Sequence, residues 1–502
     1  MEITVLIFLS SGLFLGWSLG ANDAANVFGT AVGARMIRFT TAAMICSVFL
    51  ILGAVIGGAG AAHGLGKLGA VNALAGSFTA ALTAALTVYW MTKAQLPVST
   101  TQAVVGAIVG WNWFTGSITD LGALTKIVGT WIAAPILGAL FGALLYKVTV
   151  FVIRWTRMHL LSLDMYTRIA LVLAGAFGSY SLGANNIGNV MGVFVSSSPF
   201  SDIEVGELFR LSSVQQLFLL GAVAIAVGVF TYSKRVMLTV GNSLMPLTPV
   251  AAFVVVLASS LVLFIFASTG LEHFLVKTGL PTIPLIPVSS SQAVVGAIIG
   301  IGLLKGLKGA RQIRWGVLLN IAGGWVATPV IAALLSFGLL FVVQNVFKQQ
   351  VFETVTFSVT DAVIARLQEE GVPTEHVGEL KDEVISPAVE FRNRLRETTT
   401  LTSAQQDKVI EAATIYETEI SAEKFADLDR YYLTEAQIDA VAGLFGGRFQ
   451  YKWELAETLA SRSKVWRMKP AEPINKISNQ KMQAQLDYVA GEFHISPDDD
   501  GY

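Results

Sequence analysis

The stretch GANDAANVFG, residues 20–29, lies inside an apolar run that begins at Ile3. It places two asparagines and one aspartate, Asp23, where a membrane-spanning helix is ordinarily apolar. A second apolar segment carries the related stretch GANNIGNVMG at residues 183–192. A carboxylate inside a membrane costs about 3 kcal/mol or more, so such residues face a partner, water or a ligand. The two stretches, called the signatures below, are therefore candidate functional sites.

Composition indicates a membrane-embedded body followed by an acidic tail. Of the 502 residues, 53% are hydrophobic and only 14% are charged, whereas about a quarter of a typical soluble protein is charged. Up to residue 350 the chain has 18 Lys and Arg and 8 Asp and Glu, and from residue 351 it has 16 and 27. The single cysteine, Cys46, excludes an intramolecular disulfide.

Ten apolar segments divide the body, and most have the ~20 residues that a helix needs to cross the hydrocarbon core. Two shorter segments open with proline, at Pro97 and Pro287, which favours half-helical or re-entrant structure. The predicted fold class is an all-α polytopic membrane protein with a soluble, mainly helical C-terminal domain. The segments lie near residues 3–34, 38–60, 70–92, 97–114, 118–153, 168–197, 211–230, 248–268, 287–304 and 314–347.

An internal repeat relates the two halves of the body. PVSTTQAVVGAIVG at residues 97–110 matches PVSSSQAVVGAIIG at 287–300 in eleven of fourteen positions, and WIAAP at 131–135 matches WVATP at 325–329. About five segments per half is an odd number, so the second copy enters the membrane from the opposite side. Such inverted-topology repeats are a common plan of secondary transporters. The predicted domains are repeat 1 (1–153), a basic connector (154–167), repeat 2 (168–347) and the tail (351–502).

Hydroxyl side chains follow both prolines, at the start of each short segment. The N-terminus of a half-helix carries free N–H groups and partial positive charge, which suits an anion. The two triplets would therefore bind an oxyanion, although ordinary N-capping also favours Ser and Thr. The triplets are Ser99, Thr100 and Thr101, and Ser289, Ser290 and Ser291.

Asp23 has three interpretations. It holds a cation such as Na⁺ together with Asn22, Asn26 and backbone carbonyls freed by a broken helix. It accepts a hydrogen bond from a protonated substrate. In the structural interpretation, it is only the N-cap of a helix that starts at Ala24. Glycines of the signatures fit close backbone approach or helix breaks; they are Gly20, Gly29, Gly183, Gly188 and Gly192.

The chain resembles the inorganic phosphate transporter (PiT) family over about residues 1–347. The resemblance rests on the two signatures, on the PVSTTQ and PVSSSQ segments, and on the order of these four motifs along the chain. The resemblance implies cation-coupled symport of inorganic phosphate, with Na⁺ or H⁺ as coupling ion and no other cofactor. It implies phosphate contacts from Asp23, Asn26 and the first triplet, with Asn186, Asn189 and the second triplet as their symmetry mates. It also implies sodium ligands among Asn22, Asp23, Asn26, Asn185 and Asn189.

The sequence departs from the family pattern at three positions. Asn186 stands where the second signature usually carries Asp, and Gln102 and Gln292 stand where His commonly follows the triplet. Losing a carboxylate favours sulfate, a dianion at neutral pH, so a sulfate permease of the same fold is the alternative. Retention of Asp23 favours phosphate. An anion channel is disfavoured because broken helices with central Ser and Thr clusters favour an occluding site. An enzyme is disfavoured because the spans hold few other acids and no paired histidines.

Basic residues suggest the orientation. With the N-terminus outside, clusters at Arg35/Arg38, 154–168, Lys234/Arg235 and 305–314 fall on one face, and the acidic loop 202–207 falls on the other, as the positive-inside rule requires. An even number of crossings then places the N-terminus and the tail outside the cell membrane. The predicted partners are phosphate or sulfate, Na⁺ and the lipid bilayer, without nucleic acid. A homodimer is an open alternative to a monomer.

Overall fold

The computed structural model describes residues 3–66, 68–69, 71–94, 98–195, 198, 200, 203–205, 209–240, 245, 247–426, 428 and 432–495. The chain forms two compact units. One, the body, consists of Met1–Thr115, Thr119–Glu272 and Ile283–Glu353. The other, the tail unit, consists of Gly116–Ile118, His273–Thr282 and Thr354–Tyr502. Pro97 lies outside the described residues, as do residues 202, 206 and 207 of the acidic loop 202–207.

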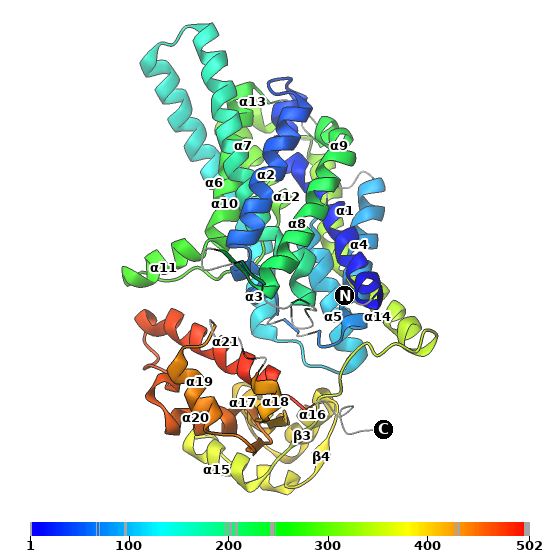
Figure 1. Cartoon of the computed structure of the whole chain (residues 1–502). Helices are drawn as coiled ribbons and strands as arrows, with labels where there is room; N and C mark the ends of the chain where they lie inside the picture. Colours follow the sequence, from blue (N-terminus) through cyan, green and yellow to red (C-terminus); the bar gives the residue numbers. More distant parts are fainter. Residues whose placement is uncertain are drawn as a thin grey trace. The chain divides into compact units, whose positions relative to one another are not determined.

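Helices build the body in two halves (Figure 1). The first half has α1 (Ile3–Gly33), α2 (Phe39–Gly57), α3 (Ala59–Gly66), α4 (Leu74–Lys93), α5 (Thr100–Thr115) and α6 (Leu121–Thr156). The second half has α7 (Leu160–Met191), η1 (Gly192–Phe194), β1 (Ile203–Val205), β2 (Phe209–Leu211), α8 (Ser213–Thr231), α9 (Ser233–Val240), α10 (Pro249–Ala267), α12 (Ser290–Leu304), α13 (Gly306–Ala310) and α14 (Trp315–Asn345). Between α10 and α12 lies α11 (Thr269–Lys277), whose residues from His273 onward belong to the tail unit.

In the described part of the chain, eight helices are long and apolar enough to cross a membrane, all of them in the body. Their outward faces are also apolar. On α6, Ile132, Ile136 and Leu140 are each more than half exposed at a spacing of four residues. α14 exposes an equivalent stripe that includes Val326 and Val330. A helix that is apolar on all sides needs lipid around it, and the prediction of a polytopic membrane protein is confirmed.

Several helices of each half pack against helices of the other half, in matching pairs. α2 packs on α7 as α8 packs on α1, and α5 packs on α14 as α12 packs on α6. Glycines make these contacts close. A Cβ on Gly106 of α5 would lie 2.2 Å from the Pro329 carbonyl oxygen, and one on Gly296 of α12 would lie 2.1 Å from the Pro135 carbonyl oxygen. Small residues permit this approach of helix backbones in membranes, so each half is completed by the other.

α5 and α12 are half-helices. They contain 16 and 15 residues, or about 24 Å of rise, which is less than the ~30 Å hydrocarbon core. Residues 280–289 before α12 have no regular secondary structure, and Val98 and Ser99 precede α5 without helical structure. The prediction of short, half-helical segments at these two places is confirmed.

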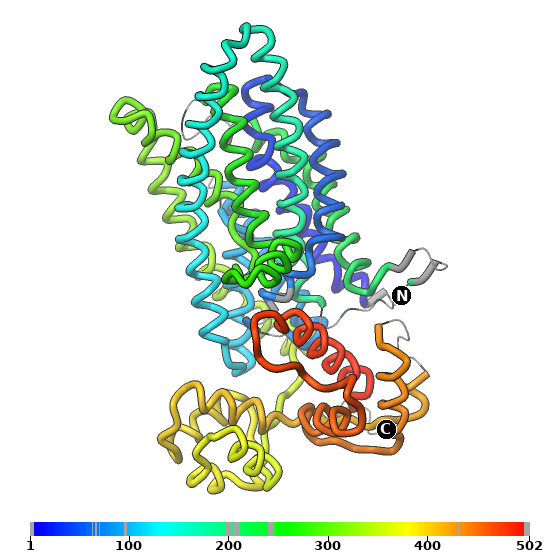
Figure 2. Tube along the Cα trace, turned by 90° about the vertical axis from the view of Figure 1, so that its left-hand side faces the viewer, coloured from blue at the N-terminus to red at the C-terminus, as the bar shows by residue number. Residues whose placement is uncertain are grey.

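The basic segments lie toward one end of the body (Figures 1 and 2). They are the turn between α1 and α2, the turn between α6 and α7, and helices α9 and α13. α1 ends and α7 begins at this end, so the two signature helices run in opposite directions. α6 extends to Thr156 and α7 starts at Leu160, so most of the basic connector 154–167 is helical.

The signatures do not interrupt their helices, contrary to one expectation. α1 continues through residues 20–29 and α7 through residues 183–191, so Asp23 is not the N-cap of a helix starting at Ala24. Nor do the signatures free backbone carbonyls for a cation. Their first glycines serve packing instead, since a Cβ on Gly20 would lie 1.9 Å from the Ile225 carbonyl oxygen and one on Gly183 2.1 Å from that of Leu50.

The tail unit is mainly helical, as predicted. Two apolar cores stabilise it, one around Phe391 and Tyr451 and the other around Trp466 and Phe493. Capping boxes begin α17 at Thr402 and α19 at Thr434. Its elements are β3 (Phe357–Ser358), α15 (Asp361–Glu369), η2 (Val377–Leu380), β4 (Val384–Ile385), α16 (Ala388–Thr398), α17 (Ser403–Ala413), β5 (Thr418–Glu419), α18 (Ala422–Phe425), α19 (Glu435–Ala442), β6 (Arg448–Phe449), α20 (Lys452–Arg462), η3 (Lys464–Trp466), η4 (Pro473–Asn475) and α21 (Lys476–Glu492).

Candidate functional site

In each hydroxyl triplet, the first residue caps the half-helix and the other two are available to the site. Ser99 Oγ accepts from the Gln102 backbone N–H at 3.4 Å, and Ser289 Oγ accepts from that of Gln292 at 3.3 Å. The first hydroxyl of each triplet is therefore an N-cap, as the structural interpretation proposed. The second and third hydroxyls lie in the first helical turn, outside that capping bond. All six residues are at most 4% exposed.

The signature residues are also buried, on continuous helices. Asn22, Asp23 and Asn26 lie within about one turn of α1, and Asn185, Asn186 and Asn189 occupy the same positions on α7. None of the six is more than 8% exposed. A spacing of three or four residues places side chains on one face of a helix. Each signature therefore presents a polar face inside an apolar body.

Hydrogen bonds connect each signature to the half-helix of the other half. Ser290 Oγ donates to Asp23 Oδ2 at 3.1 Å, and Asn26 Nδ2 donates to Ser290 Oγ at 3.0 Å. In the opposite direction, Asn189 Nδ2 donates to Thr101 Oγ1 at 2.9 Å. The structure thus brings both signatures and both triplets together in one site, although 88 to 267 residues separate the bonded partners.

The first asparagine of each signature holds the chain that leads into its own half-helix. Asn185 Nδ2 donates to the Val288 carbonyl at 2.7 Å, and its Oδ1 accepts from the Val288 N–H at 2.9 Å. Asn22 Nδ2 lies 3.5 Å from the Val98 carbonyl and 3.1 Å from Asp23 Oδ1. Both polar atoms of the Asn185 amide bond Val288, so Asn185 holds the chain before α12 in position.

Several buried polar atoms in these segments have no hydrogen-bond partner among the described residues. Thr100 Oγ1 and Asn186 Nδ2 are donors, and Asn189 Oδ1, Gln102 Oε1 and Gln292 Oε1 are acceptors. Each buried group of this kind costs about 1–3 kcal/mol if it stays unpaired. Unused donors suit an oxyanion, and unused oxygens suit a hard cation. Both kinds of ligand are therefore chemically matched to the site.

Gln102 and Gln292 were not among the predicted ligands. The sequence marked them only as departures from a family pattern, yet both side chains are 1% exposed and leave an oxygen unpaired. Their position three residues after a capping serine, repeated in both halves, was the available signal. Among the described residues, no group of three or more His, Cys, Asp or Glu could hold a metal, so a cation here would depend on amide, hydroxyl and backbone oxygens with Asp23.

The similarity to known proteins covers mainly the body of this chain. The chain matches the profile of the "Phosphate transporter family" over residues 19–336 and 278–372. It is 27% identical over 340 residues to a protein of Methanocaldococcus jannaschii named as a phosphate permease, with 67% of this chain and 97% of that one covered. A Haemophilus influenzae protein named in the same way is 24% identical over 421 residues. A solved structure described as "The sodium-dependent phosphate transporter" shares the fold, with TM-score 0.53 and 24% identity over 68% of this chain and 99% of that one.

Proposed function

Because the chain belongs to the phosphate transporter family, we propose that it is a secondary active transporter that moves inorganic phosphate together with Na⁺ or H⁺ across the cell membrane. The observation that carries this proposal is the crosswise site, in which Asp23 on α1 accepts from Ser290 on α12 and Asn189 on α7 donates to Thr101 on α5. A ligand bound there contacts both halves at once. Its binding is thereby coupled to the movement of one half against the other.

The anion would bind between the two half-helix N-termini. Each terminus contributes about half a positive charge and free backbone N–H groups. The unpaired donors Thr100 Oγ1 and Asn186 Nδ2 complete the cradle. Asp23 accepts a hydrogen bond from the hydroxyl that protonated phosphate still carries, which favours phosphate over an unprotonated anion. The other proposed contacts are Asn26, Ser99, Thr101, Asn189, Ser289, Ser290 and Ser291.

The coupling cation would neutralise the charge that Asp23 and the anion share. Asp23 with the unpaired oxygens of Asn189, Gln102 and Gln292 offers the oxygen ligands that Na⁺ needs. The solved relative is described as sodium-dependent, which supports Na⁺ ahead of H⁺. Asn22 and Asn26 remain proposed ligands, and we assign Asn185 the positioning role described above.

Alternating access follows if the halves are inverted repeats. The antiparallel signature helices and the matching helix pairs support that relation. α4 with α5 and α10 with α12 each leave one end of the body and return to it (Figure 1), so the N-terminus and the end of α14 fall on the same side. Cytoplasmic placement of the basic end then puts the N-terminus and the start of the tail outside.

Sulfate is the second candidate substrate, and Asn186 is the observation that favours it. A second carboxylate at that position would repel a dianion, whereas the Asn186 amide leaves Nδ2 free to donate. Sulfate offers four acceptor oxygens and no proton. Discrimination between the two anions then rests on Asp23, which rejects an anion that has no proton to share.

Binding of labelled phosphate to purified full-length protein, titrated with NaCl and then with sulfate, tests the proposal. We expect Na⁺ to tighten phosphate binding and sulfate to compete weakly. Thr100→Val should weaken binding at least tenfold. Thr167→Val is the matched control, because Thr167 is also buried, at 7% exposed against 1% for Thr100, but donates to the Leu163 carbonyl of its own helix. Equal binding by the two variants, or tighter binding of sulfate than phosphate, would contradict the proposal.

A further inference from the structure

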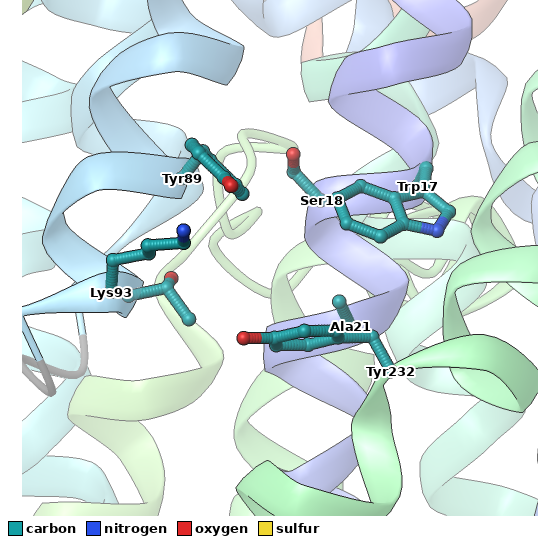
Figure 3. Close-up of a pocket in the computed structure, with 7 residues that line it drawn as sticks. Trp17, Ser18, Ala21, Tyr89, Lys93 and Tyr232 are labelled. Carbon is teal, nitrogen blue, oxygen red and sulfur yellow. The ribbon is translucent and has the colours of Figure 1, made fainter.

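A cleft lined by aromatic, hydroxyl and lysine side chains opens between α1, α4 and the end of α8 (Figure 3). The cleft is partly open to its surroundings, and its space of about 10 Å³ has room for about one oxygen-sized group. Figure 3 shows the Lys93 ammonium and the hydroxyls of Tyr89 and Tyr232 directed into the same space. The lining residues are Trp17, Ser18, Ala21, Tyr89, Thr92, Lys93 and Tyr232.

The cleft is separate from the crosswise site. Successive residues of a helix are about 100° apart, so Ala21, which lines the cleft, and Asp23 point to nearly opposite sides of α1. α1 is therefore a wall between the two places. Because the helix has 31 residues and Ala21 lies near its middle, the cleft is at mid-height of the body, at the level of the signature.

Lys93 places a positive charge in the cleft, and no ion-pair partner for it is seen among the described residues. It is the last residue of α4, and its Nζ lies 5.3 Å from the centroid of the Tyr89 ring. Within the described ranges, no carboxylate comes within ion-pair distance of this ammonium. Lys93 is exposed, so its ammonium is accessible, and an anionic partner from outside the described chain is the chemistry that fits.

Two hydroxyls in the cleft also have no partner among the described residues. Ser18 is 4% exposed and its Oγ is unpaired, as is Thr92 Oγ1. The residue at the same place before the second signature is Ser181, whose Oγ donates to the Phe177 carbonyl at 2.9 Å. Ser18 thus lacks the backbone bond that its counterpart makes. This difference between Ser18 and Ser181 is not one that a shared packing role would require.

We propose that this cleft is an oxyanion subsite for a phosphate group, bound by the Lys93 ammonium and the hydroxyls of Ser18 and Thr92. One phosphate oxygen enters the space between the hydroxyls, and the rest of the group lies at the mouth beside Lys93. The phosphate group is free inorganic phosphate or belongs to an anionic lipid headgroup. The subsite does not depend on the crosswise site, because α1 separates them.

Full-length protein in lipid nanodiscs tests the subsite with two probes. In phosphatidylcholine nanodiscs, labelled inorganic phosphate is titrated. In nanodiscs that also contain phosphatidylglycerol, retained lipid is counted by native mass spectrometry. Lys93→Gln and Ser18→Ala should each weaken either the binding of inorganic phosphate or the retention of phosphatidylglycerol. For Lys93→Gln the loss should be at least fivefold. Loss of phosphate binding identifies the free anion, and loss of retained phosphatidylglycerol identifies the headgroup.

Matched variants make the outcome decisive. Lys308→Gln removes an exposed charge on α13, and Ser181→Ala removes the paired hydroxyl; both should match the wild type. Asp23→Asn should lose binding at the crosswise site and keep binding at the cleft, so failure of one site is distinguished from failure of the other. If Lys93→Gln and Ser18→Ala match their controls with both probes, the subsite does not exist.

Discussion

At the scale of single residues, Asp23 carries the one formal charge in the crosswise site. We predict that Asp23→Asn lowers cation-coupled phosphate uptake at least tenfold. Asn retains the shape and an oxygen that can accept from Ser290 Oγ, but the charge that balances the cation is lost. Uptake into proteoliposomes and a thermal unfolding curve, expected to change little, check this. Undiminished, still cation-dependent uptake would refute the role of Asp23.

At Asn186 a carboxylate can be added to the crosswise site, whereas Asp23→Asn removes one. In Asn186→Asp the new carboxylate has one oxygen held by Asn185 and Asn189, and its second oxygen takes the place of the unpaired Nδ2. We expect sulfate to compete with phosphate at least threefold less well than in the wild type, because an unprotonated dianion then meets two carboxylates. Competition measured at fixed Na⁺ tests this. Unchanged or stronger competition by sulfate would show that Asn186 does not face the anion.

Sequence patterns predicted which residues of the site are polar, but not how they pair. The repeated triplets and signatures were visible from spacing alone. That Ser290 bonds Asp23, or Thr101 bonds Asn189, depends on how the two halves pack, which no local pattern encodes. The unpaired oxygens of Gln102 and Gln292 were missed for the same reason, since burial without a partner is a tertiary property.

At the scale of helices, glycines decide how closely the half-helices approach the long ones. A Cβ on Gly296 would meet the Pro135 carbonyl oxygen at 2.1 Å, a backbone atom that cannot move aside. We predict that Gly296→Ala destabilises the protein by about 1–3 kcal/mol through overpacking and also lowers uptake, because α12 carries the second triplet.

Gly323→Ala on α14 is the matched control for that change. No atom lies within 4 Å of a Cβ at Gly323, so the substitution should be neutral or stabilising by up to about 1 kcal/mol, the helix propensity of alanine over glycine. Thermal unfolding in detergent compares the two. A Gly296→Ala variant as stable as Gly323→Ala would contradict the close α12–α6 contact.

Local sequence signals predicted the start of α12 correctly but not the continuity of the two signature helices. Proline and hydroxyls before α12 indicated its start, because a proline-led cap ends extended chain and begins a helix. Glycines in the signatures suggested helix breaks, yet α1 and α7 run through them. Glycine weakens a helix by about 1 kcal/mol, but Gly20 and Gly183 permit backbone approach to α8 and α2, and packing outweighs propensity there.

At the scale of the whole molecule, α6 is the element that fixes sidedness most directly. Its 36 residues span about 54 Å, so its two ends lie on opposite sides of the membrane. In a Cys46→Ala background, Leu121→Cys should react with an impermeant maleimide added outside intact cells. Thr156→Cys, beside the basic turn, should react only after the cells are opened. The reverse pattern would overturn the proposed orientation, including that of the tail.

Uptake of labelled phosphate and, separately, of labelled sulfate into proteoliposomes, with and without an inward Na⁺ gradient, tests the central claim most directly. We predict phosphate uptake that needs the Na⁺ gradient, or a proton gradient if H⁺ is the coupling ion, together with little sulfate uptake. Sulfate uptake without phosphate uptake, or phosphate flux that no cation gradient accelerates, would contradict a site in which Asp23, a cation and phosphate bind together.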